Sequence, residues 1–174
     1  TVTNNSGGGQ PVSMANVKAL RALCDRYGVR IYLDATRMAE NSYFIQQREE
    51  GYADKSVRAI LREICDLTDG ATMSAKKDLL VNIGGFFACN DESIFLKAQN
   101  MVVVYEGLHT YGGMAGRTME VLSQGLEEMC DEKEVRWVML QTERFTQRLR
   151  DGGVPLDEAC HHTAEGLDAE GEGG

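Results

Sequence analysis

The chain has 174 residues, of which 43% are hydrophobic and 26% are charged. These values are ordinary for a globular domain with a sizeable core, and they exclude a low-complexity polar chain. The formal net charge of −9 disfavours binding to nucleic acid or to an anionic membrane surface. We expect neither a membrane span nor a signal peptide, and hence a cytoplasmic location. The five cysteines form no CxxC pair, which predicts thiols rather than a zinc site.

The first part of the sequence predicts a loop, a helix and a strand in that order. Glycines and a proline at 6–11 are typical of a loop. Ser13 is a suitable helix cap, and Gly28 is a suitable left-handed end for the same helix. The apolar run at 29–33 predicts a strand, with Asp34 at its carboxyl end.

The rest of the sequence continues the alternation of helices and strands. We expect two helices (about 38–49 and 54–67), strands at 71–74 and 82–89, a helix capped by Asp91, and a helical stretch over 113–150 that breaks near Asp131. Glycines in the 82–89 strand predict a close approach by another group. The segment MVVVYEG at 101–107 fits either the end of the Asp91 helix or a separate strand. Alternation of this kind predicts an α/β fold with a mostly parallel sheet.

Charged side chains follow two of the predicted strands. Asp34 ends one strand, and Lys76 and Lys77 follow another. Ligands of parallel α/β sheets bind beyond the carboxyl ends of the strands, so these groups are candidates for one site.

The candidate residues suit pyridoxal phosphate. Lys77 could bind the cofactor's aldehyde covalently, and Asp34 could pair with the ring nitrogen. Ser74 could bind the phosphate, and Arg37 could face the ring oxygen. Simpler interpretations exist for each: a strand-end aspartate is commonly a helix cap, and a pair of lysines is commonly a solvated surface.

Four segments resemble one enzyme family in order and spacing. They are NSGGGQPVSMAN, YLDATRMAENSYFIQQRE, DGATMSAKKDLLVNIGGF and VVVYEGLHTYGGMAGRTME. The stretch from Asn5 to about Arg117 resembles the aromatic amino acid β-eliminating lyases, the tryptophanases and tyrosine phenol-lyases. Weaker similarity continues to about Pro155. The resemblance implies a PLP-dependent transferase-like fold of type I, a homotetramer and activation by a monovalent cation such as potassium.

The resemblance also implies a role for each matching residue. Lys77 would be the lysine that binds the cofactor, Asp34 would pair with the pyridinium nitrogen, Arg37 and Asn5 would contact the ring oxygen, Ser74 would bind the phosphate, and the backbone carbonyl of Asn82 would help to hold the cation. The freed Lys77 would then remove the α-proton of the substrate, with Asp34 stabilising the resulting charge.

The implied reaction is cleavage of L-tryptophan to indole, pyruvate and ammonia. The alternative is cleavage of L-tyrosine to phenol, pyruvate and ammonia. FIQQRE and MSAKKD favour tryptophanase slightly, whereas DATR, GYADKS and VNIGG are at least as similar to tyrosine phenol-lyase. A threonine-aldolase-like lyase is a further alternative.

The resemblance covers part of such an enzyme. We expect residues 1–155 to be part of the cofactor-binding large domain and residues 156–174 to be a divergent, disordered, acidic and glycine-rich tail. The family's phosphate-binding loop and ring-stacking aromatic residue would precede Thr1, and its small carboxyl-terminal domain has no counterpart here. We therefore expect that this chain alone is incomplete for activity. A non-catalytic fragment is the corresponding alternative.

Overall fold

The computed structural model describes residues 1–3, 9–107 and 114–156. Its elements are α1 (Met14–Tyr27), β1 (Tyr32–Asp34), α2 (Met38–Arg48), α3 (Val57–Asp66), β2 (Gly70–Ser74), β3 (Gly85–Cys89), α4 (Glu92–Glu106), α5 (Gly116–Glu128) and α6 (Glu132–Asp151). The proposed tail, residues 156–174, lies almost wholly outside the described residues.

The predicted helices are confirmed, and several begin or end at the predicted capping residues. The Ser13 hydroxyl accepts a hydrogen bond from the Asn16 amide, and Gly28 ends α1 with φ of 62°. Asp91 caps α4, which runs to Glu106, so the strand alternative for 101–107 is wrong. Asp131 caps α6 and marks the predicted break in the last helical stretch.

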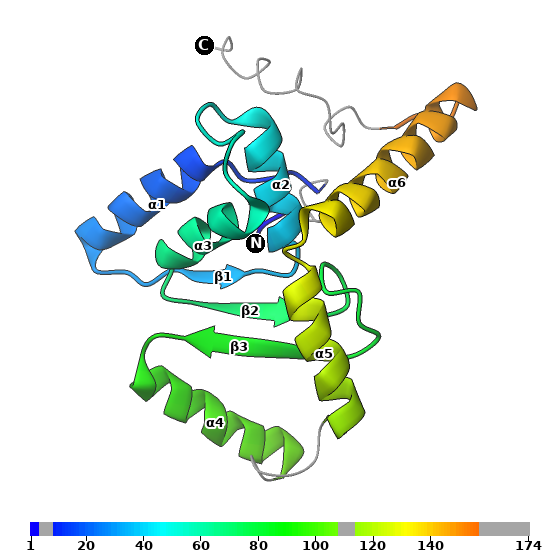
Figure 1. Ribbon diagram of the computed structural model, residues 1–174. Coiled ribbons are helices and arrows are strands. Elements are labelled where there is room, and N and C mark those ends of the chain that lie inside the picture. Colours follow the sequence, from blue (N-terminus) through cyan, green and yellow to red (C-terminus); the bar gives the residue numbers. More distant parts are fainter. Residues whose placement is uncertain (4–8, 108–113, 157–174) are drawn as a thin grey trace.

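The three strands form a mixed sheet in the order β1-β2-β3 (Figure 1). β1 and β2 are parallel, with Asp34 opposite Thr72. β2 and β3 are antiparallel, with Ser74 opposite Gly85. The expectation of a mostly parallel sheet is therefore correct for the first pair and wrong for the second. The connection over 75–84 is too short for the helical crossover that a parallel pairing needs, so the chain turns back.

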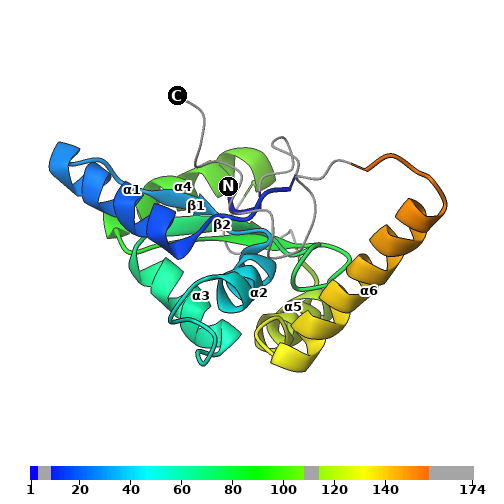
Figure 2. The ribbon, with the colours of Figure 1, turned by 90° about the horizontal axis from the view of Figure 1, so that it is seen from above.

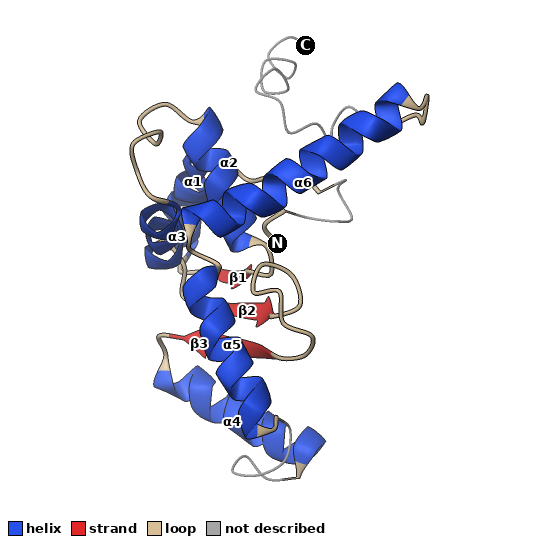
Figure 3. Cartoon of the chain, turned by 45° about the vertical axis from the view of Figure 1, so that its right-hand side comes forward, coloured by secondary structure: helices blue, strands red, loops and turns tan. Residues whose placement is uncertain are grey.

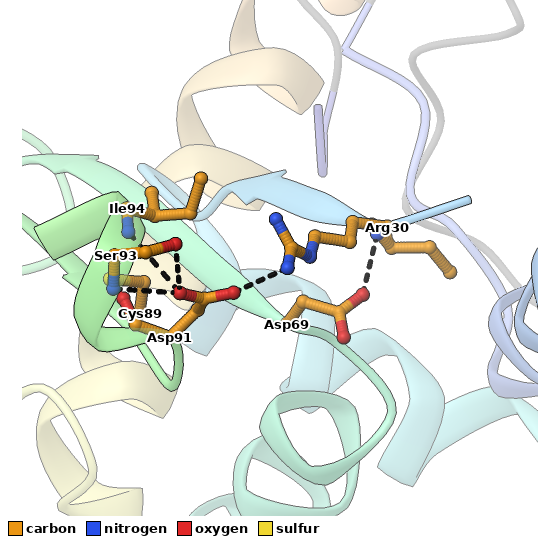
Figure 4. A network of polar contacts seen from close by, with 7 residues as sticks. Arg30, Asp69, Cys89, Asp91, Ser93 and Ile94 are labelled. Carbon is orange, nitrogen blue, oxygen red and sulfur yellow. Dashed lines mark hydrogen bonds and ion pairs between the residues drawn. The ribbon is translucent and has the colours of Figure 1, made fainter. Parts of the chain in front are cut away.

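β1 is shorter than the sequence predicts, and a polar network explains why. The Val29 amide donates to Cys24 O of α1, and the Ile31 amide donates to the Asp69 carboxylate at 2.7 Å. Since these bonds are made outside the strand ladder, β1 begins only at Tyr32. Figure 4 shows the part of this network around Asp69, in which Arg30 also pairs with the Asp91 carboxylate that caps α4. The network holds the amino ends of β1 and β2 and leaves their carboxyl ends to the candidate site.

The helices lie around the sheet on different sides. Viewed from above, α2, α3 and α5 lie on one side of the strands and α4 lies on the other (Figure 2). In Figure 3, α1, α2 and α3 lie beyond the β1 end of the stacked strands, α4 lies beyond the β3 end, and α6 projects away from the sheet. The largest fully buried apolar side chains are Met14, Val57, Ile60 and Ile64. Within the described ranges, no helix is long and apolar enough to span a membrane.

The predicted close approach in the 82–89 segment is a contact between two strand backbones. A Cβ atom at Gly85 would lie 2.5 Å from the carbonyl oxygen of Met73 in β2. The preceding Gly84 has φ of +121°, which a residue with a side chain rarely adopts. β3 therefore begins at Gly85 rather than at residue 82, and tight backbone packing explains this glycine pair without a ligand.

Candidate active site

The carboxyl ends of β1 and β2 meet at one edge of the sheet. Their parallel pairing sets Asp34 beside Thr72, and the next amide, of Ala35, donates to Thr72 O at 2.8 Å. Ser74 lies two residues farther along β2 and ends that strand. The sequence prediction that Asp34 and the Ser74–Lys77 region lie at the same edge is borne out by this pairing.

The hydroxyl of Thr36 connects the two strand ends. Thr36 Oγ1 donates to Asp34 Oδ1 at 2.8 Å and accepts the Ser74 amide at 3.2 Å. The Thr36 amide also approaches Asp34 Oδ1, at 3.4 Å. The Oδ1 atom of half-buried Asp34 thus accepts hydrogen bonds from Thr36, and none of these bonds involves Oδ2.

Arg37 stands at the start of α2. It occupies the cap position, and no side chain of its own segment caps the helix there. Arg37 Nε lies 3.8 Å from Glu40 Oε2 on the first turn. The Ala39 amide donates instead to Asp78 Oδ2, at 2.6 Å. Asp78, in the connection between β2 and β3, therefore accepts a hydrogen bond from the first turn of α2.

The two lysines lie on a turn whose ends are fixed and buried. Lys76 and Lys77 are exposed, whereas Ala75, Leu79 and Val81 are buried. The Val81 amide donates to Ala75 O at 3.2 Å, which closes the turn. Buried apolar anchors on both sides of an exposed lysine pair fix where the amines emerge.

Helix α5 packs directly against this turn. A Cβ atom at Gly125 would lie 2.6 Å from Leu79 O and 3.2 Å from Val81 Cγ1. Only a residue without a side chain allows this approach, because real Cβ atoms essentially never come within 3.0 Å of such a neighbour. Gly125 thus sets the distance between α5 and the lysine turn.

A cavity of about 240 Å³ opens between the lysine turn and the helices around it. Its charged lining comes from α2, the turn, α5 and α6: Arg37, Glu40, Lys76, Lys77, Asp78, Glu128 and Glu134. Its apolar lining includes Met129, Val135 and Val138. The cavity therefore offers cationic donors and acidic acceptors beside an apolar wall.

Two carboxyl groups of this cavity are shifted toward their neutral forms. Burial, with a smaller contribution from the charge of Glu40, raises the pKa of Asp78 to about 8, against the opposing effects of the Ala39 and Glu40 amides and the charge of Arg37. Burial likewise raises the pKa of Glu40, with Arg37 acting in the opposite direction. Perturbed carboxyl groups in a cavity are typical of functional sites, although structural networks produce them as well.

The structure brings the sequence-predicted residues together in two groups. Arg37 and Lys77 line the cavity, and Asp34 is linked to Ser74 through Thr36. Asn82 is exposed in the β2–β3 connection and is not among the cavity-lining residues. Asn5 lies outside the described residues.

Three residues that hold the site were missed in the sequence. Thr36 lies inside the DATR motif, and Asp78 directly follows Lys77, so their neighbours in sequence were a usable signal. Gly125 had no such signal, because a lone glycine in a helical pattern does not reveal what approaches it. Within the described ranges, no group of three or more His, Cys, Asp or Glu residues could hold a metal ion.

Comparison with known proteins decides the family. The family model of the beta-eliminating lyases matches residues 1–171. The chain belongs to the beta-eliminating lyase family. This membership confirms the resemblance drawn from the sequence motifs, and the family implies pyridoxal phosphate and a fold of type I. The mixed α/β arrangement around the three strands is consistent with that fold.

Relatives in this family carry two names. The chain is 54% identical over 154 residues to a tyrosine phenol-lyase of Nostoc punctiforme, covering 88% of this chain and 33% of that protein. It is 51% identical over 168 residues to a tyrosine phenol-lyase of Symbiobacterium thermophilum, covering 97% and 37%. It is 50% identical over 169 residues to a tryptophanase of Salinibacter ruber, covering 97% and 36%. The chain thus spans about a third of the length of these curated relatives.

Proposed function

We propose that this chain supplies the cofactor lysine and part of the pyridoxal phosphate site of a lyase that β-eliminates aromatic L-amino acids. The observation that carries the proposal is the Thr36 link, which holds Asp34 and the Ser74 amide at one sheet edge, three residues before Lys77. Family membership and the names of the relatives support the same reaction class over a threonine-aldolase-like one.

The residues at this edge fit the chemistry of the cofactor. Lys77 Nζ would hold the aldehyde carbon, and the second oxygen of Asp34 would accept the ring N–H and keep the ring protonated. Arg37 would donate to the ring oxygen, with Asn5 as a second contact, and Ser74 would donate to the phosphate. When bound, pyridoxal phosphate supplies the electron sink that makes the α-proton of an amino acid removable.

The protein's own contribution to the reaction is proton transfer in a fixed geometry. Once the substrate's amine has replaced it on the aldehyde carbon, the freed Lys77 Nζ would accept the α-proton of the substrate. Buried Ala75 and Leu79 fix the backbone from which the Lys77 side chain extends. The apolar wall of the cavity would exclude water from its charged lining. Elimination would release indole from tryptophan or phenol from tyrosine, with pyruvate and ammonia in either case.

Further properties of the whole enzyme follow as proposals. We infer a homotetramer, a cytoplasmic location, and potassium held in part by the Asn82 carbonyl. Residues 1–155 would form part of the large cofactor-binding domain. Because the chain spans about a third of the length of its relatives, the remaining parts of the site would come from sequence outside this chain. Potassium dependence of product release, compared with sodium at equal ionic strength, tests the cation proposal.

Product release tests the reaction and separates the two substrates. The protein carrying this chain is loaded with pyridoxal phosphate and given L-tryptophan or L-tyrosine. Indole or phenol release that is lost in Lys77→Arg and kept in Lys76→Arg supports the proposal. Cofactor binding at Lys77 without release of either product would refute the aromatic β-elimination and retain only the cofactor site.

A further inference from the structure

The first turn of α2 has no side-chain cap from its own segment, although the Met38 amide donates to Ala35 O at 3.1 Å. The first amides of a helix have no partner within the helix, and a Ser, Thr, Asp or Asn cap commonly accepts one of them. In α2 the cap position is held by Arg37, whose guanidinium donates hydrogen bonds and accepts none. With an arginine at this position, the Ala39 amide depends on a side-chain acceptor from elsewhere.

Asp78 supplies that acceptor from the lysine turn. Its Oδ2 atom accepts the Ala39 amide at 2.6 Å across 39 residues of sequence. Asp78 directly follows Lys77, and Ala39 lies two residues after Arg37. The next residue after Asp78, Leu79, is buried, which anchors the backbone beside the carboxyl group. One hydrogen bond therefore ties the segment of Lys77 to that of Arg37.

We propose that Asp78 is a positioning residue that fastens the Lys77 turn to the first turn of α2, and so fixes the spacing of Lys77 and Arg37 around the cavity. The inference rests on the proposed function for the roles of Lys77 and Arg37. The hydrogen bond itself stands without it. Asp78 touches neither substrate nor cofactor in this proposal, because it acts through the two residues that it holds.

The charge state of Asp78 makes this contact sensitive to pH. Its Oδ1 atom is buried and accepts no hydrogen bond among the described residues, so ionisation leaves half of the carboxylate unsatisfied. The charged and titratable groups facing it are Arg37, Glu40, Lys76, Lys77, Glu128, Cys130 and Glu134. Burial raises the pKa of Asp78 from 3.8 to about 8. The neutral form is therefore favoured by folding, and its contribution is complete below about pH 4 and lost as pH rises through about 8.

Two substitutions separate this positioning from simple packing. Asp78→Asn keeps an acceptor for the Ala39 amide and does not ionise, whereas Asp78→Ala removes the acceptor. The matched control is the same pair of changes at exposed Asp54. Amide hydrogen exchange at Ala39 is measured by NMR, and the dissociation constant of pyridoxal phosphate is measured by absorbance from pH 6.5 to 9.5.

Asp78→Ala is expected to raise the exchange rate of the Ala39 amide and the cofactor dissociation constant each about tenfold, and Asp78→Asn to leave both within about threefold. Relative to Asp78→Asn, the wild-type affinity is expected to fall up to about tenfold between pH 7 and 9, since Asp78 ionises in that interval. Both Asp54 variants are expected to match the wild type. A purely structural role would not give a pH profile that Asp78→Asn abolishes.

Several outcomes would overturn the inference. One is that Asp78→Ala leaves exchange and affinity within twofold of wild type. Another is that Asp78→Asn keeps the wild-type pH profile, which remains decisive if Asp78→Ala fails to fold. A wild-type protein that binds no pyridoxal phosphate would refute the proposed function instead, and the exchange of the Ala39 amide would still decide whether Asp78 holds α2.

Discussion

Replacing Gly125 by alanine tests whether α5 positions the lysine turn. The Cβ atom of Gly125→Ala would lie 2.6 Å from Leu79 O, 3.1 Å from Leu79 Cβ and 3.2 Å from Val81 Cγ1. The nearest of these atoms is a backbone oxygen, which cannot rotate away as the end of a side chain can. Helix and turn must therefore separate by about 0.8 Å to bring the 2.6 Å distance to the 3.4 Å of an ordinary contact, within a region that is otherwise close-packed.

Two opposing terms set the expected magnitude. Alanine is better than glycine in a helix interior by about 1 kcal/mol. Forcing extra volume into a packed site costs about 1–3 kcal/mol. Because Gly125 is buried and its nearest neighbour is backbone, we expect the second term to exceed the first, with a net loss of up to about 2 kcal/mol.

Urea unfolding followed by circular dichroism measures this change, with Gly116→Ala in the same helix as the matched control. Gly116 has no neighbour within 4 Å of its would-be Cβ atom, so this variant is expected to be neutral or stabilised by a few tenths of a kcal/mol. Gly125→Ala should also weaken pyridoxal phosphate binding, since Leu79 lies two residues from Lys77. Equal stabilisation by both alanines would refute the packing argument.

Two further changes probe the strand-end link and a cluster remote from the site. Thr36→Val is expected to raise the cofactor dissociation constant about tenfold or more, because it removes the hydroxyl that donates to Asp34 at 2.8 Å and leaves only the amide at 3.4 Å; Thr36→Ser keeps the hydroxyl and is expected to bind like the wild type, and equal binding by both variants would contradict this. The ammonium groups of Lys18 and Lys55 with Tyr52 lower the pKa of Glu63 from 4.5 to about 2, so its contribution is present above about pH 4.5 and lost as pH falls through about 2. Glu63→Gln should therefore cost about 1 kcal/mol at pH 7 and almost nothing at pH 2, as acid titration of the urea midpoint would measure.

The sequence predicted the ends of the helices better than it predicted the ends of the strands or the residues that hold the candidate site together. Helix ends depend on nearby residues such as Ser13 and Asp91, whose side chains reach amides within a turn, so local patterns located them. Strand ends depended on remote partners. β1 started late because Asp69, far along the chain, takes the Ile31 amide.

The predicted site residues and the missed ones differ in the same way: the first follow from strand ends, and the second depend on remote contacts. Asp34 and Lys77 were placed at one edge of the sheet because parallel strands end together. Thr36 and Asp78 stand beside predicted site residues, which was a usable signal, but their contacts were not foreseen because each partner lies 38 or 39 residues away in the sequence. β3 was assigned correctly as a strand, but its direction depended on the length of the 75–84 turn, which the expectation of a parallel sheet overlooked.

The most direct test of the central claim is the site of covalent attachment of the cofactor. The protein is incubated with one equivalent of pyridoxal phosphate, reduced with borohydride and digested, and the modified peptide is sequenced by mass spectrometry. We expect the phosphopyridoxyl group on Lys77, none on the adjacent Lys76, and loss of the label in Lys77→Arg. A label on Lys76, or one that persists in Lys77→Arg, would contradict it.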